Sequence, residues 1–112
     1  MTGPCNLTES FVDANVSIQP GAYILVNVNN VAVYMGRSDS DLNSRLKDHM
    51  PSQETNISIK RTGPTSFYFK NTQFAKDAYI LECNWYHKYN PTCNISHPAK
   101  NSCDWFCPVC GL

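Results

Sequence analysis

The sequence predicts an α+β domain in which a small central antiparallel β-sheet is flanked by helices. Residues 21–36 hold two runs rich in β-branched and aromatic residues around a two-residue turn, which indicates a β-hairpin. Two stretches near 40–50 and 73–89 carry apolar residues at helical spacing, and short strand-like runs near 56–70 lie between them. A length of 112 residues allows one such domain.

The first twenty residues are polar and end at Pro20, so we expect an N-terminal extension at 1–20. Asn6 with Glu9 three positions later has the spacing of a helix-capping pair. One short helix is therefore predicted over about 7–14.

The hairpin pattern sorts its side chains onto two faces. With Asn29 and Asn30 as the loop, Leu25 lies opposite Tyr34 and Tyr23 opposite Gly36. A four-residue loop would set the tyrosines directly opposite each other, and a three-residue loop would separate them. The tyrosine face is expected to be half-exposed. The other face is wholly apolar and is expected to form the core: Ala22, Ile24, Val26, Val28, Val31, Val33 and Met35.

The helix near 40–50 is predicted to begin at Asp39 or Ser40 and to end before Pro51. Four of its side chains point toward the protein body: Leu42, Leu46, Arg45 and His49. Arg45 and His49 are either functional residues or structural ones. In the structural case, Arg45 packs its aliphatic stem against the protein and reaches solvent with its charge, and His49 is a hydrogen-bonded core histidine.

Residues 56–61 and 65–70 are predicted to be two further strands. The second helix, 73–89, is expected to be capped by Thr72 and stopped by Asn90 and Pro91. Glu82 lies about 20° beyond the edge of its apolar stripe, which makes it either a candidate metal ligand or an ordinary solvated glutamate. The stripe comprises Phe74, Ala78, Leu81, Trp85 and Tyr89.

Charge and hydropathy exclude some classes of protein. The formal net charge is zero, although nine basic and six acidic residues between Arg37 and Lys100 give that segment a charge of +3. This balance does not favour a dedicated nucleic-acid binder. No apolar run approaches the roughly 18 residues of a spanning helix and no signal peptide begins the chain, so we expect a cytoplasmic protein without membrane contact.

Cysteines concentrate at the carboxyl end, where CDWFCPVC has metal-ligand spacing. We expect a zinc-binding tail over 99–112, in which Cys107 and Cys110 form a knuckle and Cys103 is the third ligand. His97 is the preferred fourth ligand and Cys93 the alternative. Free thiols, or disulfides in a secreted glycoprotein with NxS/T sites, are the other interpretations.

Several motifs, each weak by itself, occur in the order and spacing of a known protein family. The chain resembles the GIY-YIG endonuclease family over about residues 20–98, and it is similar to the amino-terminal nuclease of the excision-repair incision enzyme. The matching features are GAY at 21–23, YMGRS from Tyr34, Arg45 and His49 on the following helix, LE ending at Glu82, and NP followed by Asn94. Ala22 and Met35 replace branched residues of the motifs, which changes volume but not chemistry.

The resemblance implies that residues 21–98 are a nuclease domain that hydrolyses phosphodiester bonds of DNA. Arg45 would contact phosphate, and Glu82 would be the single ligand of Mg²⁺ or Mn²⁺. The remaining implied site residues are the motif tyrosines Tyr23 and Tyr34, the neighbouring His49, and Asn94, which would order the site. Arg37 and Lys47 are further candidates for DNA contact.

A phenol is a poor base at neutral pH, so Tyr23 would need nearby positive charge to assist water attack. The alternative of a covalent tyrosine nucleophile is less favoured. The short chain implies that a protein partner, a homodimer or structure in the DNA supplies specificity. A non-catalytic zinc-containing nucleic-acid-binding adaptor is the alternative function.

Overall fold

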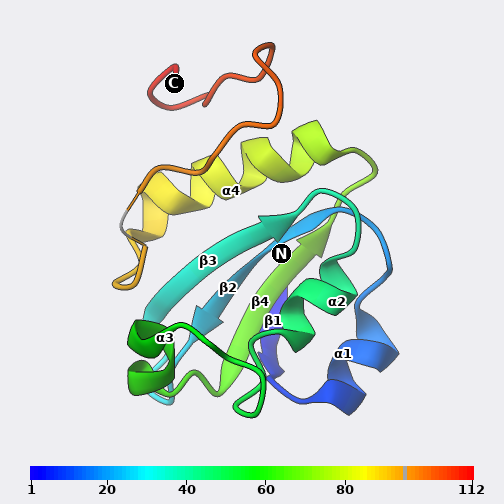
Figure 1. Cartoon of the computed structure of the whole chain (residues 1–112), viewed down its shortest axis with the longest axis vertical. Coiled ribbons are helices and arrows are strands. Elements are labelled where there is room, and N and C mark those ends of the chain that lie inside the picture. The colour runs from blue at the N-terminus through cyan, green and yellow to red at the C-terminus, as the bar shows by residue number, and fades with distance from the viewer. Residues whose placement is uncertain (95) are drawn as a thin grey trace.

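A four-stranded antiparallel sheet forms the centre of the computed structural model, which describes residues 1–94 and 96–112 (Figure 1). The strand order is β1-β4-β2-β3, and the predicted α+β class with flanking helices is confirmed. The strands are β1 (Thr2–Asn6), β2 (Gly21–Val26), β3 (Ala32–Ser38) and β4 (Ser66–Asn71). The helices are α1 (Glu9–Asn15), α2 (Leu42–Lys47), α3 (Ile57–Thr62) and α4 (Ala75–Tyr89).

Strand β2 is buried on both faces, because α1 and α2 cover one side of the sheet and α4 covers the other. Tyr23 and Leu25 pack with Leu42 of α2, whereas Ile24 packs with Trp85 of α4. The prediction that the tyrosine face is half-exposed is therefore wrong for Tyr23, which is 0% exposed. A strand covered on both sides is apolar at nearly every position, which is what GAYILV shows.

The predicted hairpin register is confirmed up to Leu25, but it shifts between Leu25 and Val26, where Val26 pairs with Ala32, and the loop is longer than two residues. The two expected cross-strand pairs are present: Leu25 with Tyr34 and Tyr23 with Gly36. The Asn27 side chain accepts hydrogen bonds from two backbone N–H groups of the loop, which ends the ladder before the predicted turn. Val28 and Val31 are consequently 82% and 46% exposed and do not join the core.

Residues 1–20 are part of the domain and not an extension of it. Strand β1 pairs with β4, and α1 packs against α2. Helix α1 is capped by Thr8, whose hydroxyl accepts from the Phe11 N–H at 3.3 Å. Asn6, the expected cap, is instead the last residue of β1.

The strand predicted over 56–61 is a helix, α3. Asn56 caps it by accepting from the Ile59 N–H at 3.2 Å, and Gly63 ends it in the left-handed conformation at φ 59°. The alternation of isoleucines suggested a strand, but Ile57 is 65% exposed and only Ile59 is buried. The following strand, β4, lies where it was predicted.

The two predicted flanking helices exist with shifted starts. Asp41, and neither Asp39 nor Ser40, caps α2, and α4 begins at Ala75 without a side-chain cap from Thr72. Asn90 ends α4 at φ 46°, as expected. Across residues 1–94 and 96–112, no helix is both long enough and apolar enough to cross a membrane.

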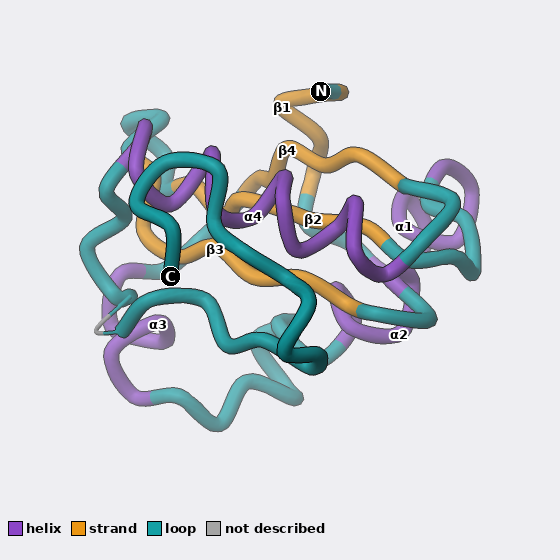
Figure 2. Tube along the Cα trace, turned by 90° about the horizontal axis from the view of Figure 1, so that it is seen from above, coloured by secondary structure: helices purple, strands orange, loops and turns teal. Residues whose placement is uncertain are grey.

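Helix α4 buries a second face that the sequence did not predict. The tail returns alongside α4 on the side away from the sheet (Figures 1 and 2). Tyr79 and Cys83 of α4 form a small core there with Cys107 and Trp105 of the tail. Phe74, assigned to the apolar stripe, lies before the helix and is 61% exposed.

Candidate active site

Three side chains from two segments of the sequence form a buried series of hydrogen bonds. The Tyr23 hydroxyl of β2 lies 2.5 Å from His49 Nε2, and His49 Nδ1 lies 2.5 Å from Glu54 Oε2. The His49 and Glu54 side chains are 6% and 7% exposed. Sequence analysis missed Glu54, although a carboxylate five residues after a histidine thought to face the body was a usable signal.

Burial sets the protonation of this series. It raises the pKa of Tyr23 well above 10, and the positive charge of Arg45 only partly opposes the rise. Burial also lowers the pKa of His49, against the opposing effect of Glu54. At neutral pH, Tyr23 therefore donates to Nε2 of a neutral imidazole whose Nδ1–H donates to Glu54.

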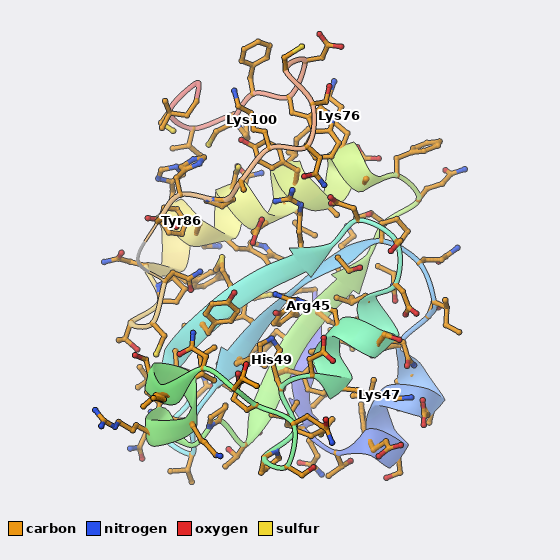
Figure 3. All side chains as sticks on the ribbon, viewed as in Figure 1. Arg45, Lys47, His49, Lys76, Tyr86 and Lys100 are labelled. Carbon is orange, nitrogen blue, oxygen red and sulfur yellow. The ribbon has the colours of Figure 1, made fainter. Side chains whose placement is uncertain are left out.

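Arg45 lies beside this series with its guanidinium accessible (Figure 3). Its side chain is 45% exposed, and its ion pair with Asp48, at 3.9 Å, is long. Together with Tyr34 and His49, it lines a hollow of about 390 Å³. The Tyr34 ring lies 5.5 Å from the His49 ring and 6.3 Å from the Tyr23 ring. The Arg45 guanidinium is thus partly exposed in a hollow that Tyr34 and His49 also line.

Glu82 of α4 is buried and paired with Arg37 of β3. Glu82 Oε1 accepts from Arg37 Nη1 at 2.7 Å, and Asp39 accepts from Arg37 Nε at 2.8 Å. Burial raises the pKa of Glu82, and Arg37 opposes that rise. Arg37 is only 10% exposed and both of its carboxylate partners are in place, so the prediction of Arg37 as a DNA contact is not supported.

Asn94 orders the edge of β3. Its amide donates to the Met35 carbonyl and accepts from the Met35 N–H, both at 2.9 Å. A second hollow of about 330 Å³ is lined by Tyr34, Glu82 and Asn94. Tyr34 and Asn56 line both hollows, so Arg45 and His49 lie on one side of Tyr34 and Glu82 on the other.

The second hollow fits a magnesium ion. Glu82 is the one carboxylate among its described lining residues, and Arg37 engages only Oε1. Oε2 has no hydrogen-bond partner in the part of the chain that the structure describes. A hard oxygen donor of this kind suits Mg²⁺, which takes one or two carboxylates and keeps water or phosphate as its other ligands.

Lys47 and Cys103 lie outside this site, whereas Cys93 and His97 border its Glu82 hollow. Lys47 pairs with Asp13 of α1 and lines neither hollow that adjoins Tyr34 (Figure 3). Cys93 lines the Glu82 hollow, and Cys103 is exposed beside Asp104. Four tail and α4 side chains instead form a cluster of their own: His87, His97, Cys107 and Cys110.

A fold of this topology, with two tyrosines, an arginine and a buried glutamate on the helix that covers the sheet, defines a metal-dependent nuclease of the GIY-YIG type. The sequence matches the UvrC-like GIY-YIG domain family over residues 19–95. The N-terminal GIY-YIG endonuclease domain of UvrC from Thermotoga maritima, solved with magnesium as its catalytic divalent cation, is 26% identical with a TM-score of 0.60. That alignment covers 70% of this chain and 85% of the Thermotoga domain.

Similar full-length proteins carry the name of the same repair nuclease. UvrABC system protein C from Methanosphaera stadtmanae is 32% identical over 84 residues, which is 70% of this chain. Its counterpart from Caldicellulosiruptor saccharolyticus is 26% identical over 86 residues, or 73% of this chain. This chain spans about 14% of the length of either relative. The chain belongs to the UvrC-like GIY-YIG domain family and is an endonuclease domain of that family.

Proposed function

We propose that this domain hydrolyses phosphodiester bonds of DNA by tyrosine-assisted attack of water, with one Mg²⁺ ion on Glu82. The observation that supports this most is that two neighbouring hollows, both lined by Tyr34, hold the two halves of the site. His49 and Glu54, which are hydrogen-bonded in series with Tyr23, line one hollow, and Glu82 lines the other. Phosphodiester hydrolysis needs a base for the attacking water and positive charge at the phosphate and the leaving oxygen.

Tyr23 acts as a proton relay and not as a free phenolate, because its raised pKa keeps the phenol neutral. As water attacks phosphorus, the phenol oxygen takes a water proton while its own proton moves to His49 Nε2. The resulting imidazolium is stabilised by Glu54, which accepts its Nδ1–H.

Arg45 binds the phosphate that is cleaved. Its planar guanidinium offers two parallel donors to phosphoryl oxygens, and its long pair with Asp48 does not compete strongly. Tyr34, between the two hollows, is placed to donate to an oxygen of the same phosphate.

Glu82 holds the metal ion. When bound, Mg²⁺ supplies positive charge at the phosphoryl and leaving oxygens. Arg37 fixes one oxygen of the Glu82 carboxylate by a 2.7 Å bond, which leaves the other for the ion. Mn²⁺, which also prefers oxygen ligands, would serve in its place.

DNA is the proposed substrate, and specificity is expected to come from structure in the DNA, a protein partner or a homodimer. The UvrABC names belong to the relatives, and this chain spans only about 14% of their length. The zinc ion expected for the tail is a separate proposal, because His87, Cys107 and Cys110 lie outside both hollows, although His97 also lines the Glu82 hollow.

Nicking of supercoiled and branched DNA by wild type, Glu82→Ala and Asp77→Asn tests the proposal. We expect Glu82→Ala to lose about 10³-fold in rate or more, since it removes the sole protein carboxylate on the metal. DNA binding should survive, because phosphate contacts dominate affinity. Asp77→Asn, an exposed acid on the same helix, is the matched control and should cleave like wild type.

Cleavage that persists in Glu82→Ala or in EDTA would contradict the assignment. DNA binding by wild type without any cleavage would favour the non-catalytic adaptor.

A further inference from the structure

We propose that His87, His97, Cys107 and Cys110 form a Zn²⁺ site that fastens the carboxyl tail to helix α4. This ligand set differs from the one predicted by sequence, because His87 replaces Cys103. Among the four, His87 lies within α4 of the nuclease fold, and the other three lie beyond residue 95, where the family match ends. The site does not depend on the nuclease function proposed above.

The four ligand atoms converge on one point. They all lie within 4.8 Å of one another, and Cys110 Sγ is 3.4 Å from His97 Nε2. A tetrahedral zinc ion with ordinary bond lengths places such atoms about 3.3–3.8 Å apart. Side-chain movements of about 1 Å would therefore bring the four atoms to the distances of a zinc ligand shell.

His97 is oriented for metal binding by its second nitrogen. Nδ1 donates to the Pro98 carbonyl at 3.0 Å, which leaves the Nε2 lone pair facing Cys110. Zinc-binding histidines regularly donate their other ring N–H to a carbonyl or a carboxylate in this way.

The backbone around Cys107 has the shape of a zinc knuckle. The N–H groups of Val109 and Cys110 face the Cys107 sulfur, and the Gly111 N–H donates to the Cys107 carbonyl at 2.9 Å. Gly111 has φ +79°, a conformation that glycine adopts without strain. Two sulfurs are thereby presented on one side of a tight turn.

His87 completes the shell, and Cys103 does not. His87 lies in the last turn of α4, on an exposed part of the helix, with its ring 5.3 Å from the His97 ring. Cys103 is exposed and its thiol donates to Asp104 at 3.9 Å. Two thiolates and two imidazoles form a common tetrahedral zinc shell. With His87 as a ligand, the ion links helix α4 to the tail. With Cys103 in its place, the ion would link only residues beyond α4 to one another.

The fastened tail reaches the active site through Arg37. Trp105 of the tail and Tyr79 of α4 place their rings 5.6 and 5.1 Å from the Arg37 guanidinium. Asn101 of the tail donates to Asp39, the other partner of Arg37. This consequence rests on the proposed function: loss of zinc should loosen Arg37 and slow cleavage through Glu82.

Metal content of the full chain, measured with thiols kept reduced, tests the ligand set. Wild type should hold one zinc ion per chain, and Co²⁺ in its place should show the visible absorption of a tetrahedral thiolate site. His87→Gln and Cys110→Ser should each weaken binding by tenfold or more. Cys103→Ser and Cys93→Ser are the matched controls and should bind zinc like wild type.

A second variant separates lost ligation from lost folding. His87→Cys keeps four ligands and adds a thiolate, so the thiolate-to-cobalt absorption should rise about 1.5-fold, from two sulfurs to three. Retained binding in His87→Gln with loss in Cys103→Ser would overturn the assignment of His87. Wild-type protein without zinc, or with Cys107 and Cys110 joined by a disulfide under reducing conditions, would overturn the site itself. The ligand experiments do not measure nuclease activity, so their failure is distinguishable from failure of the proposed function.

Discussion

Replacing Glu54 with glutamine tests the proton relay at a residue that does not touch DNA or metal in the proposed mechanism. Glutamine keeps the oxygen that accepts from the Asn56 N–H at 3.0 Å, so the loop should hold its shape. At the other position an amide N–H₂ replaces the carboxylate oxygen that accepts from His49 Nδ1. His49 would then move its proton to Nε2, where it can no longer accept from Tyr23.

The expected loss follows from the charge that Glu54 stabilises. A carboxylate about 4 Å from the imidazolium charge, at an effective dielectric constant near 20, contributes about 4 kcal/mol. At 1.36 kcal/mol for each tenfold change, removing it should slow cleavage by about 10³-fold. This lies within the roughly 10² to 10⁴-fold range of general base catalysis.

Single-turnover cleavage of a nicked or branched DNA at saturating Mg²⁺ measures this loss, with DNA binding measured in parallel. Asp48→Asn is the control, because it removes one negative charge from the same region at an exposed position. It should change the rate by no more than about twofold to threefold. A Glu54→Gln rate within tenfold of wild type, with binding unchanged, would refute the relay.

Two further predictions concern the same region. Arg45→Lys should lose at least about tenfold in rate with an unchanged unfolding midpoint, since lysine lacks the planar fork, and near-normal cleavage would show that Arg45 does not bind the cleaved phosphate. Burial lowers the pKa of His49 below its usual 6.5, so the unfolded chain binds a proton that the folded chain does not, and the free energy of unfolding should fall as pH drops below 6.5. His49→Gln should lose this pH dependence in urea unfolding, and an unchanged slope would contradict it.

The hairpin could be predicted from sequence because its information is local. Alternation and strand propensity set which residues face each other, and the Tyr23 with Gly36 pair followed directly. The structure adds the reason for the glycine: a Cβ at Gly36 would lie 2.5 Å from the Tyr23 hydroxyl oxygen. A side chain there would displace the phenol from His49.

Features that depend on tertiary contacts could not be predicted in the same way. Strand β1 pairs with a segment sixty or more residues away, and nothing in the first six residues indicates that partner. The isoleucine alternation at 57–59 fits a strand or one turn of helix equally well until the Asn56 cap is seen. Glu54 was missed because a single acid in a loop is ordinarily solvated.

The position of Arg37 shows how the tail and the nuclease site depend on each other. Sequence reasoning assigned its charge to DNA, but a buried glutamate needs a compensating charge more than the substrate does. Arg37 provides that charge to Glu82 and is itself enclosed by Asp39, Tyr79 and Trp105. Trp105 belongs to the tail, outside the residues that match the family. The carboxylate proposed to hold the metal is therefore supported by a segment that the family match does not include, so the proposed zinc site would serve catalysis as well as stability.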